Sequence, residues 1–167
     1  MLTRSLSLVF ILCFSFLSCD NQLAFSDYRS FSDGWKNTDT LEYSFEAPDT
    51  VNPFHLFFNT RVNQDYEFDN LFLITNIQFP NGMQIGDTLE YKMAYPNGEL
   101  MGEGFGSIKE SKLWYKAGVT LSEQGTYTIK INQVMRKFGK VEALDTLKGI
   151  MDFGVHIETI PKQKQEN

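Results

Sequence analysis

Cys19 is the residue of this 167-residue chain whose position most clearly predicts a chemical modification. It follows an apolar run from Leu6 to Leu17 that is broken only by serines, and Arg4 supplies a positive charge before this run. A membrane-spanning helix needs about 20 apolar residues, whereas a shorter run behind a positive charge is typical of a secretory signal peptide, which is removed after export. The sequence therefore predicts a signal peptide over residues 1–18.

The residues before Cys19 resemble a bacterial lipobox, in which apolar and small residues precede a cysteine that receives a diacylglyceryl group. Ser18 is small, as this motif requires, and Phe16 occupies the position where leucine is commonest. The alternatives are a buried strand thiol and a disulfide with Cys13, but Cys13 would leave with the signal peptide, and the mature chain has no other cysteine. We therefore expect Cys19 to be lipidated, with acyl chains that anchor the protein firmly in a membrane.

The two histidines, His55 and His156, are the next candidates for chemistry. A zinc site or a nucleophilic site would require them to converge with each other or with a carboxylate. They are far apart in the chain, and each lies in a strand pattern next to residues that would face a core. We therefore expect them to be strand residues with ordinary hydrogen-bond partners.

Three acidic residues, Asp65, Glu67 and Asp69, are spaced two apart in the segment NQDYEFDN. In a loop, such carboxylates can coordinate Ca²⁺, which takes several oxygen ligands, although the glycine and the closing glutamate of an EF-hand are missing. In a hairpin they would instead share one solvated face that flanks Tyr66 and Phe68. The sequence favours this acidic rim and leaves the calcium site open.

The segment GELMGEGFGSIKESKLWYK, residues 98–116, contains Gly102, Gly104 and Gly106 at alternate positions. A phosphate-binding glycine loop should follow a strand and open a helix within a βαβ unit, and the sequence predicts no such unit. Glycines at alternate strand positions more often mark a bulge or the close approach of another backbone. We expect one of these structural roles here.

Trp114 and Tyr115 are adjacent, so in a strand one side chain points inward and the other outward. An exposed aromatic ring beside Lys112 and Lys116 can stack on a sugar or contact a protein partner. The favoured alternative is structural, with Trp114 in the core and Tyr115 at the surface. Both residues are candidate contacts for a partner or a glycan.

Composition disfavours several classes of function. The full chain has 15 basic and 21 acidic residues, and removal of Arg4 with the signal peptide lowers the net charge from −6 to −7. This balance disfavours binding to nucleic acid and direct adhesion to anionic lipid. The mature chain has only one thiol, so no disulfide framework and no cysteine metal site are expected. No segment assembles a nucleophile, a base and an orienting group, so we expect neither catalysis nor a cofactor.

The elements that must position these residues show strand periodicity. Apolar and polar residues alternate over short segments, which is typical of half-buried strands. These segments are DTLEYSFE, HLFFNTRV, LFLITNIQF, TLEYKMAY, TYTIKINQVM and DFGVHIE. The third is apolar on nearly both faces, so it is expected to be a central strand. The nearest approach to a helix is Val141–Leu147, with one or two turns.

Turn signals separate these segments. FPNGM and YPNGE both place proline before Asn-Gly, and EQGT precedes the segment that starts at Tyr127. Several strands separated by such turns are typical of a sandwich or barrel. We predict an all-β fold with one antiparallel β-sandwich, immunoglobulin-like or jelly-roll-like, over residues 39–160. Residues 19–38 are expected to form the lipidated cysteine and a tether, and residues 161–167 a disordered tail.

One internal similarity has two explanations. The sequence DTLEY starts at Asp39 and again at Asp87, and Pro48 and Pro96 follow at the same offset. A duplicated strand-and-turn unit is one explanation. The other is a pair of similar strands near the sheet edges with outward acidic side chains.

Beyond these arguments, most of the mature chain is similar to the gliding-motility lipoprotein family GldH. The resemblance is carried, in order, by FEAPDTVNPFHLFFNTRVNQDYEFDNLFL, FPNGMQIGDTLEYKMAYPNGELMGEGFGSIKESKLWYK, GTYTIKINQVMRK and DFGVHIE. The segment GEGFG…IKE…LWYK is its most specific part, and the lipobox agrees with it. No catalytic motif transfers from the family, so Cys19 is the one residue to which the resemblance assigns a role.

The resemblance implies a cell-envelope lipoprotein of a Bacteroidota-type bacterium that takes part in gliding motility. It also implies a link to the secretion machinery that exports motility adhesins. The expected partners are other envelope or gliding-machinery proteins and the membrane, through the lipid anchor, with the outer membrane as the expected location and its face left open. The alternative function is a surface carbohydrate-binding or adhesion module, in which KLWYK supplies a stacking platform.

Overall fold

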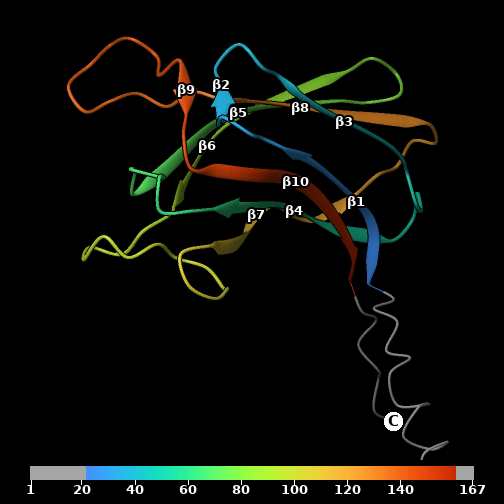
Figure 1. Ribbon diagram of the computed structural model, residues 1–167. Coiled ribbons are helices and arrows are strands. Elements are labelled where there is room, and N and C mark those ends of the chain that lie inside the picture. Colours follow the sequence, from blue (N-terminus) through green and yellow to red (C-terminus); the bar gives the residue numbers. More distant parts are fainter. Residues whose placement is uncertain (1–21, 161–167) are drawn as a thin grey trace, which may run out of the picture.

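The computed structural model describes residues 22–160, and in this range the chain forms ten β-strands and no helix (Figure 1). The strands are β1 (Leu23–Ser30), β2 (Trp35–Lys36), β3 (Leu41–Glu46), β4 (Pro53–Val62), β5 (Asn70–Gln78), β6 (Gln84–Lys92), β7 (Lys109–Thr120), β8 (Thr126–Gln133), β9 (Thr146–Leu147) and β10 (Ile150–Thr159). The all-β prediction is confirmed. No helix in this range is long and apolar enough to span a membrane.

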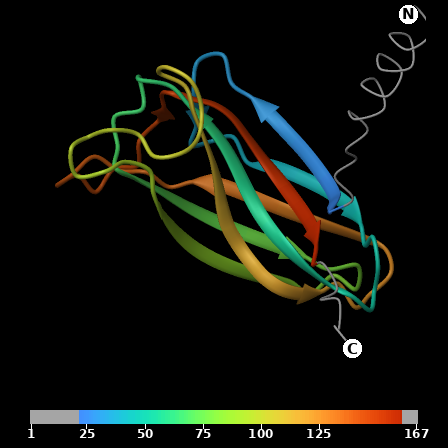
Figure 2. The ribbon, with the colours of Figure 1, turned by 90° about the horizontal axis from the view of Figure 1, so that it is seen from below.

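Two four-stranded antiparallel sheets pack face to face as a sandwich (Figures 1 and 2). Sheet I has the strand order β1-β10-β4-β7, and sheet II has the order β3-β8-β5-β6. The short pair β2-β9 forms a third ladder. Apart from the short pair β2-β9, the chain changes sheets six times: between β1 and β3, β3 and β4, β4 and β5, β6 and β7, β7 and β8, and β8 and β10. Most strand pairings therefore join segments that are distant in sequence.

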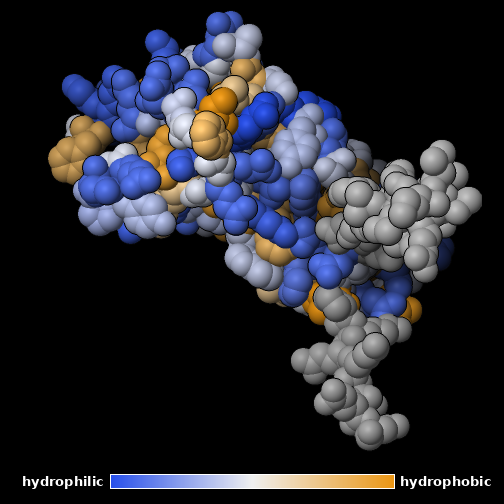
Figure 3. Space-filling model, turned by 60° about the horizontal axis from the view of Figure 1, so that its bottom comes forward, coloured by the Kyte–Doolittle hydropathy of each residue, from blue (hydrophilic) through white to orange (hydrophobic). Residues whose placement is uncertain are grey.

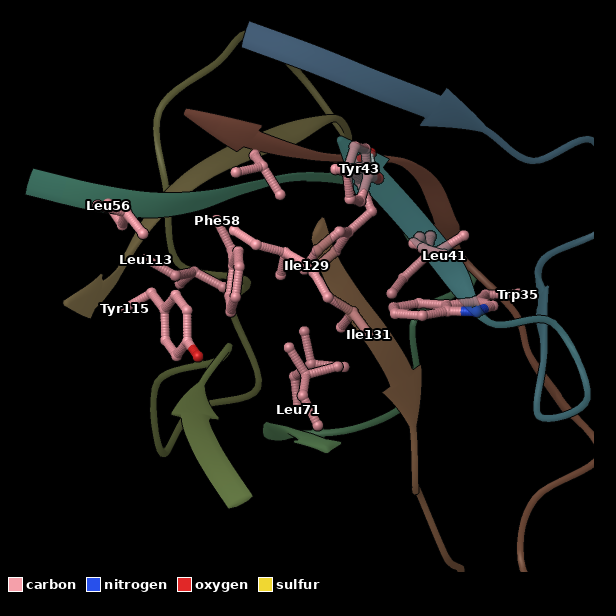
Figure 4. Packing of buried hydrophobic residues seen from close by; sticks show 14 of the residues in the cluster. Trp35, Leu41, Tyr43, Leu56, Phe58, Leu71, Leu113, Tyr115, Ile129 and Ile131 are labelled. Carbon is pink, nitrogen blue, oxygen red and sulfur yellow. Dashed lines mark hydrogen bonds between the residues drawn. The ribbon is translucent and has the colours of Figure 1, made fainter. Parts of the chain in front are cut away.

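The core between the sheets is rich in aromatic residues, as the composition suggests. Side chains from both sheets point into it, including Tyr43 and Ile129 from sheet II and Phe58 and Leu113 from sheet I (Figure 4). The buried Tyr43 hydroxyl donates a 2.7 Å hydrogen bond to the carbonyl oxygen of Phe153, so its polar atom is satisfied. Burying a large apolar side chain contributes about 1.5–3 kcal/mol, and this core is the main source of stability.

The alternating segments coincide with the main strands. In β3, the buried side chains are Leu41, Tyr43 and Phe45, as the period of two predicts. LFLITNIQF lies in β5, which is an interior strand of sheet II. The helical turns considered for Val141–Leu147 are wrong, because Thr146 and Leu147 form β9 and pair with β2.

The two Pro-Asn-Gly turns have the same hydrogen bonds. The amide of Gly82 donates to the carbonyl of Phe79, and the amide of Gly98 donates to the carbonyl of Tyr95, each over 2.9 Å. Both glycines have positive φ, at 86° and 83°. Since L-residues rarely adopt this conformation, the glycines explain why both reversals are tight.

The structure corrects the expected extent of the tether. Residues 23–30, within the expected tether, form β1, an edge strand of sheet I that pairs antiparallel with β10. The physical reason is that Phe25 packs against Phe45 of sheet II, with 5.2 Å between ring centroids. The predicted signal peptide, Cys19 and the tail 161–167 lie outside the described residues.

The two DTLEY segments lie at opposite edges of one sheet. The first contributes to β3 and the second to β6, and these are the two edge strands of sheet II. This placement agrees with the account of similar edge strands.

The two ends of the sandwich carry different connections. β1 starts beside the end of β10, which in turn pairs with the start of β4, so these termini lie at one end, called here the entry end. Segments 47–52 and 79–83 also lie there. The opposite end, called the distal end, carries the longer connections 93–108 and 134–145 (Figure 1).

Candidate functional site on the outer face of sheet I

The outer face of sheet I carries three rows of side chains that cross its four strands. The strand registers define an aromatic row (Ser26, His156, Phe57, Trp114), a middle row (Tyr28, Gly154, Asn59, Lys112) and a charged row (Ser30, Asp152, Arg61, Glu110). Figure 3 brings the underside of Figure 1 forward, where sheet I lies, and most of this surface is hydrophilic with small hydrophobic patches. These three rows are the outer-face site.

Trp114 is the most exposed aromatic residue of the outer-face site, with 55% of its surface accessible. Its ring lies 4.3 Å from the Phe57 ring and 4.9 Å from the His55 ring, measured between centroids. Phe57 is almost fully covered by these neighbours. Such contacts hold the indole in a fixed orientation while leaving part of it open to solvent.

Lys112 lies beside the Phe57 ring and forms an ion pair with Glu158. Its Nζ atom is 2.6 Å and 2.7 Å from the two carboxylate oxygens of Glu158. The same Nζ lies 4.1 Å from the centroid of the Phe57 ring, which is a cation–π contact. The lysine charge is therefore neutralised and its position fixed.

His156 is held by hydrogen bonds on both ring nitrogens. Its Nε2 lies 2.9 Å from the Ser26 hydroxyl, and its Nδ1 lies 3.1 Å from Nδ2 of Asn59. Because the Asn59 amide group donates, Nδ1 acts as the acceptor and the imidazole is neutral. Burial lowers the pKa of His156 below its usual 6.5, which agrees with this assignment.

Asn59 connects the rows and leaves one acceptor unused. Its Nδ2 also donates to the Tyr28 hydroxyl over 3.1 Å. The side chain is only 5% exposed, and Oδ1 has no hydrogen-bond partner within the described part of the chain. Buried carbonyl oxygens are normally satisfied. Asn59 also lines an open cavity of about 870 Å³ between the middle row and the 101–108 connection.

The charged row is also paired internally. Arg61 forms an ion pair with Asp152, and the Ser30 hydroxyl donates to the same carboxylate over 2.5 Å. Glu110 completes the row and lines both the large cavity and a smaller hollow of about 250 Å³ beside Tyr28. The row thus offers hydrogen-bonding groups with little excess charge.

Gly154 allows Tyr28 to lie across the middle row. A Cβ atom at position 154 would come within 2.5 Å of the Tyr28 ring, so any other residue would displace that ring. Tyr28 also meets His156 edge to face at 5.3 Å. The glycine therefore helps to shape the outer-face site.

Trp114 is exposed and stays a candidate contact, whereas the favoured assignment, with Trp114 in the core and Tyr115 at the surface, is wrong. Tyr115 is 8% exposed and stacks on Phe58 at 4.6 Å, so it belongs to the core. Side chains alternate between the two faces of β7, so Leu113 and Tyr115 point inward and Lys112 and Trp114 point outward. Tyr115 can occupy the inner position at an edge strand because its hydroxyl reaches Asp87.

The histidines lie in strands, as expected, and do not form a shared metal site. The acidic segment is a loop rather than a hairpin, and Tyr66 packs edge to face against Phe68 at 6.0 Å. Asp65, Glu67 and Asp69 are exposed. Within residues 22–160 no group of three or more histidine, cysteine or acidic side chains could hold a metal ion.

Two of the three alternating glycines, Gly102 and Gly104, mark close backbone contacts, as predicted, whereas a Cβ atom on Gly106 would meet nothing within 4 Å. A Cβ atom on Gly102 would lie 2.4 Å from the carbonyl oxygen of Glu110, and one on Gly104 would lie 2.5 Å from that of Ile108. Glu103 and Glu110 exchange two backbone hydrogen bonds of 2.8 Å and 2.7 Å. The glycines therefore let the 101–108 connection fold against β7 and form one wall of the cavity.

Sequence reasoning missed most of the outer-face site. The predicted tether includes Tyr28, and Asn59 and Arg61 belong only to a predicted strand pattern. A signal was present, because an asparagine within the apolar run HLFFNTRV is unusual in a buried strand.

Comparison with known proteins agrees with the anchor motif and the family resemblance. A curated homologue of the gliding motility lipoprotein GldH from Christiangramia forsetii is 46% identical over 158 residues, which covers 93% of this chain and 97% of the relative. The gliding motility lipoprotein GldH of Flavobacterium johnsoniae is 43% identical over 141 residues, which covers 84% of this chain and 87% of the relative.

Among solved structures, a fructofuranosidase variant from Schwanniomyces occidentalis covers 85% of this chain but only 35% of its own length is matched, with 8% identity and a TM-score of 0.41. This likeness is too weak to carry an argument. The model of the GldH lipoprotein family, in contrast, matches residues 24–157, which is nearly the whole described sandwich. With this match and the two close relatives, the chain belongs to the GldH lipoprotein family.

Proposed function

We propose that this protein is a non-catalytic, membrane-anchored lipoprotein of the cell envelope that is required for gliding motility. The observation that carries the proposal is the match of residues 24–157 to the GldH lipoprotein family, together with relatives named for gliding motility. More narrowly, the protein serves the secretion machinery associated with motility and resides in the outer membrane. Its role is to hold a rigid sandwich at the membrane and present it to other envelope proteins.

The position of β1 supports a close attachment. Cys19 precedes Gln22, the first described residue, by three positions. At roughly 3.5 Å per residue, the lipidated cysteine lies within about 11 Å of Gln22. The entry end of the sandwich therefore faces the membrane at short range, and the distal end points away from it.

The distal end then carries the segments available to partners. Phe105 and Phe138 are fully exposed in the connections 93–108 and 134–145. Exposed aromatic side chains are enriched in protein–protein contacts. A lipoprotein oriented in this way offers these connections to neighbouring envelope proteins.

The test is complementation of a clean deletion in the bacterium that carries this gene. The deletion is expected to abolish colony spreading and the movement of single cells, and the wild-type gene is expected to restore both. A gene with Cys19→Ser is expected to fail, because the unacylated protein is not retained at its membrane. Normal spreading of the deletion strain, or full rescue by Cys19→Ser, would contradict the proposal.

A matched control is an exposed substitution that leaves the anchor intact. Ile74→Ala removes a half-exposed side chain from the outer face of sheet II and is expected to complement as well as wild type. Secretion is tested separately, by measuring motility adhesins in the culture medium of the same strains. Unchanged adhesin export in a non-gliding deletion strain would remove the secretion role and leave the motility role standing.

A further inference from the structure

We infer that the outer-face site of sheet I binds a neutral oligosaccharide, with Trp114 as the stacking platform and Asn59 as a buried hydrogen-bond acceptor. This inference goes beyond the motility role and does not depend on it. It rests on the arrangement of the three rows.

Trp114 has the properties of a stacking platform for a sugar ring. Sugars stack their apolar C–H faces on aromatic rings, and this requires a ring that is exposed yet immobile. Trp114 is 55% exposed, and Phe57 and His55 contact it at 4.3 Å and 4.9 Å between centroids. The indole is therefore oriented before any ligand arrives, which lowers the entropy cost of binding.

Asn59 offers a buried hydrogen-bond acceptor that is unused within the described residues. Oδ1 of Asn59 is buried and has no partner within residues 22–160, although the amide nitrogen of the same side chain contacts both Tyr28 and His156. A buried carbonyl without a partner costs free energy that a ligand donor recovers. Asn59 lines a cavity of about 870 Å³, which is where we place the ligand. A sugar hydroxyl supplies the missing donor.

The charged side chains of the outer-face site are largely held in ion pairs. Lys112 is paired with Glu158, and Arg61 is paired with Asp152. Glu110 is then the remaining charge of the three rows, so no excess positive charge is available for a phosphate, a sulfate or a uronic acid. A ligand that is neutral and carries many hydroxyl groups, each both donor and acceptor, fits these paired side chains.

A protein partner fits this face less well. The centre of a protein–protein interface is depleted in charged residues. Here the charged residues Arg61 and Asp152 lie on the two interior strands of sheet I. The exposed aromatic side chains of the three rows are Trp114 and Tyr28, at 55% and 38%. The outer-face site therefore favours a glycan over a protein.

The experiment uses the full lipidated chain in a polyoxyethylene detergent, which contains no sugar. The probes are hexasaccharides of β-1,4-glucan, β-1,3-glucan, α-mannan and inulin-type fructan, with oligogalacturonate as the anionic comparison. Binding is measured by calorimetry and by tryptophan fluorescence. At least one neutral probe is expected to bind and to shift the emission, because Trp114 is exposed whereas Trp35 is fully buried.

Two variants and one control locate the site. Trp114→Ala is expected to weaken binding roughly tenfold or more, because it removes the stacking surface. Glu110→Ala, at the mouth of the cavity, is expected to weaken binding severalfold. Ile74→Ala, on the opposite outer face, is expected to bind like wild type. Trp114, Glu110 and Ile74 are all exposed, so the variants are expected to fold.

Three outcomes would overturn the inference. These are the absence of binding to every neutral probe, tighter binding of oligogalacturonate, and neutral-glycan binding that Trp114→Ala leaves unchanged. If no glycan binds and Trp114→Ala instead abolishes cross-linking to an envelope protein, the outer-face site is a protein interface. Colony spreading is scored in the same strains, so failure of the motility proposal is distinguished from failure of this one.

Discussion

The Tyr115 hydroxyl, on the edge strand of sheet I, donates a 3.0 Å hydrogen bond to Oδ2 of Asp87, on the edge strand of sheet II. Lys116 adds an ion pair of 2.9 Å to the same oxygen. Close by, the Tyr91 hydroxyl donates to the backbone carbonyl of Trp114 over 2.8 Å. These contacts join β7 to β6 across the open side of the sandwich and occupy one edge acceptor of β7, which limits strand addition there.

Asp87 should make folding stability depend on acid. The hydrogen bond from Lys116, with a further one from Tyr115, lowers the pKa of Asp87 below its usual 3.8. A lowered folded-state pKa stabilises the protein above the unfolded-state value, and this stabilisation is lost as the pH falls below about 4. We expect Asp87→Asn to lower the free energy of unfolding by on the order of 1 kcal/mol at pH 7 and by progressively less below pH 4.

Urea unfolding from pH 7 to pH 3 measures this difference. The control is Glu42→Gln, which removes an exposed pair with Lys130 at 3.4 Å and should change the stability little. If the free energies of unfolding of wild type and Asp87→Asn differ by the same amount at every pH, the link between the Asp87 pKa and stability is refuted.

Phe58 should be one of the most sensitive core positions. Its side chain is fully buried and stacks on Tyr115, with Phe153 at 5.5 Å. Phe58→Ala is expected to lower the free energy of unfolding by about 3–5 kcal/mol, because it leaves a cavity between the sheets. Phe105→Ala makes the same chemical change at a fully exposed position and is expected to change it by less than about 0.5 kcal/mol. Similar losses for both variants would mean that the core is not packed as described.

His156 should titrate below its usual pKa. Burial lowers the pKa of the imidazole, so the unfolded chain takes up a proton at a higher pH than the folded chain does. Stability that depends on neutral His156 is therefore present above about pH 6.5 and is lost as the pH falls below it. NMR titration of the ring protons measures the pKa directly, and His156→Gln should remove this part of the pH dependence. A pKa at or above 6.5 would contradict the buried, neutral assignment.

The two ends of the sandwich should differ in their distance from lipid. Val51 at the entry end and Val141 at the distal end are both 79% exposed, so they form a matched pair for labelling. Val51→Cys and Val141→Cys are each labelled with a fluorophore in the full lipidated chain and reconstituted in vesicles that contain a headgroup quencher. The short link from Cys19 predicts strong quenching at position 51 and weak quenching at position 141. Equal quenching would show that the sandwich is not held with its entry end against the membrane.

Local patterns predicted the interior of the fold but not its first strand. Leu41, Tyr43 and Phe45 alternate clearly with polar residues, and so β3 was identified. In β1 the residues that follow Phe25 on the same face are Asp27 and Arg29, which pair with each other at 2.9 Å. Arg29 covers the ring of Tyr43 at 5.3 Å and takes the place of an apolar side chain. The side chains of β1 therefore alternate between the two faces of the sheet, but the apolar and polar residues of its sequence do not alternate in the same way.

The outer-face site could not be predicted because long-range strand order creates it. Four different strands contribute its side chains, among them Tyr28, Asn59, Lys112 and His156. The largest sequence separation is between Ser26 and His156, which are in contact although 130 positions separate them. A single sequence does not give this order. Turn chemistry depends only on neighbouring residues, and so both Pro-Asn-Gly reversals were correctly predicted.

The lipid anchor is tested most directly by the mass of the N-terminal peptide of the protein extracted from native membranes. We expect a mature chain that begins at Cys19 and carries a diacylglyceryl group and an acyl chain on this residue. A peptide that retains residues 1–18, or a mature chain with an unmodified Cys19, would contradict this expectation. Either result would remove the lipid anchor on which the proposed function depends.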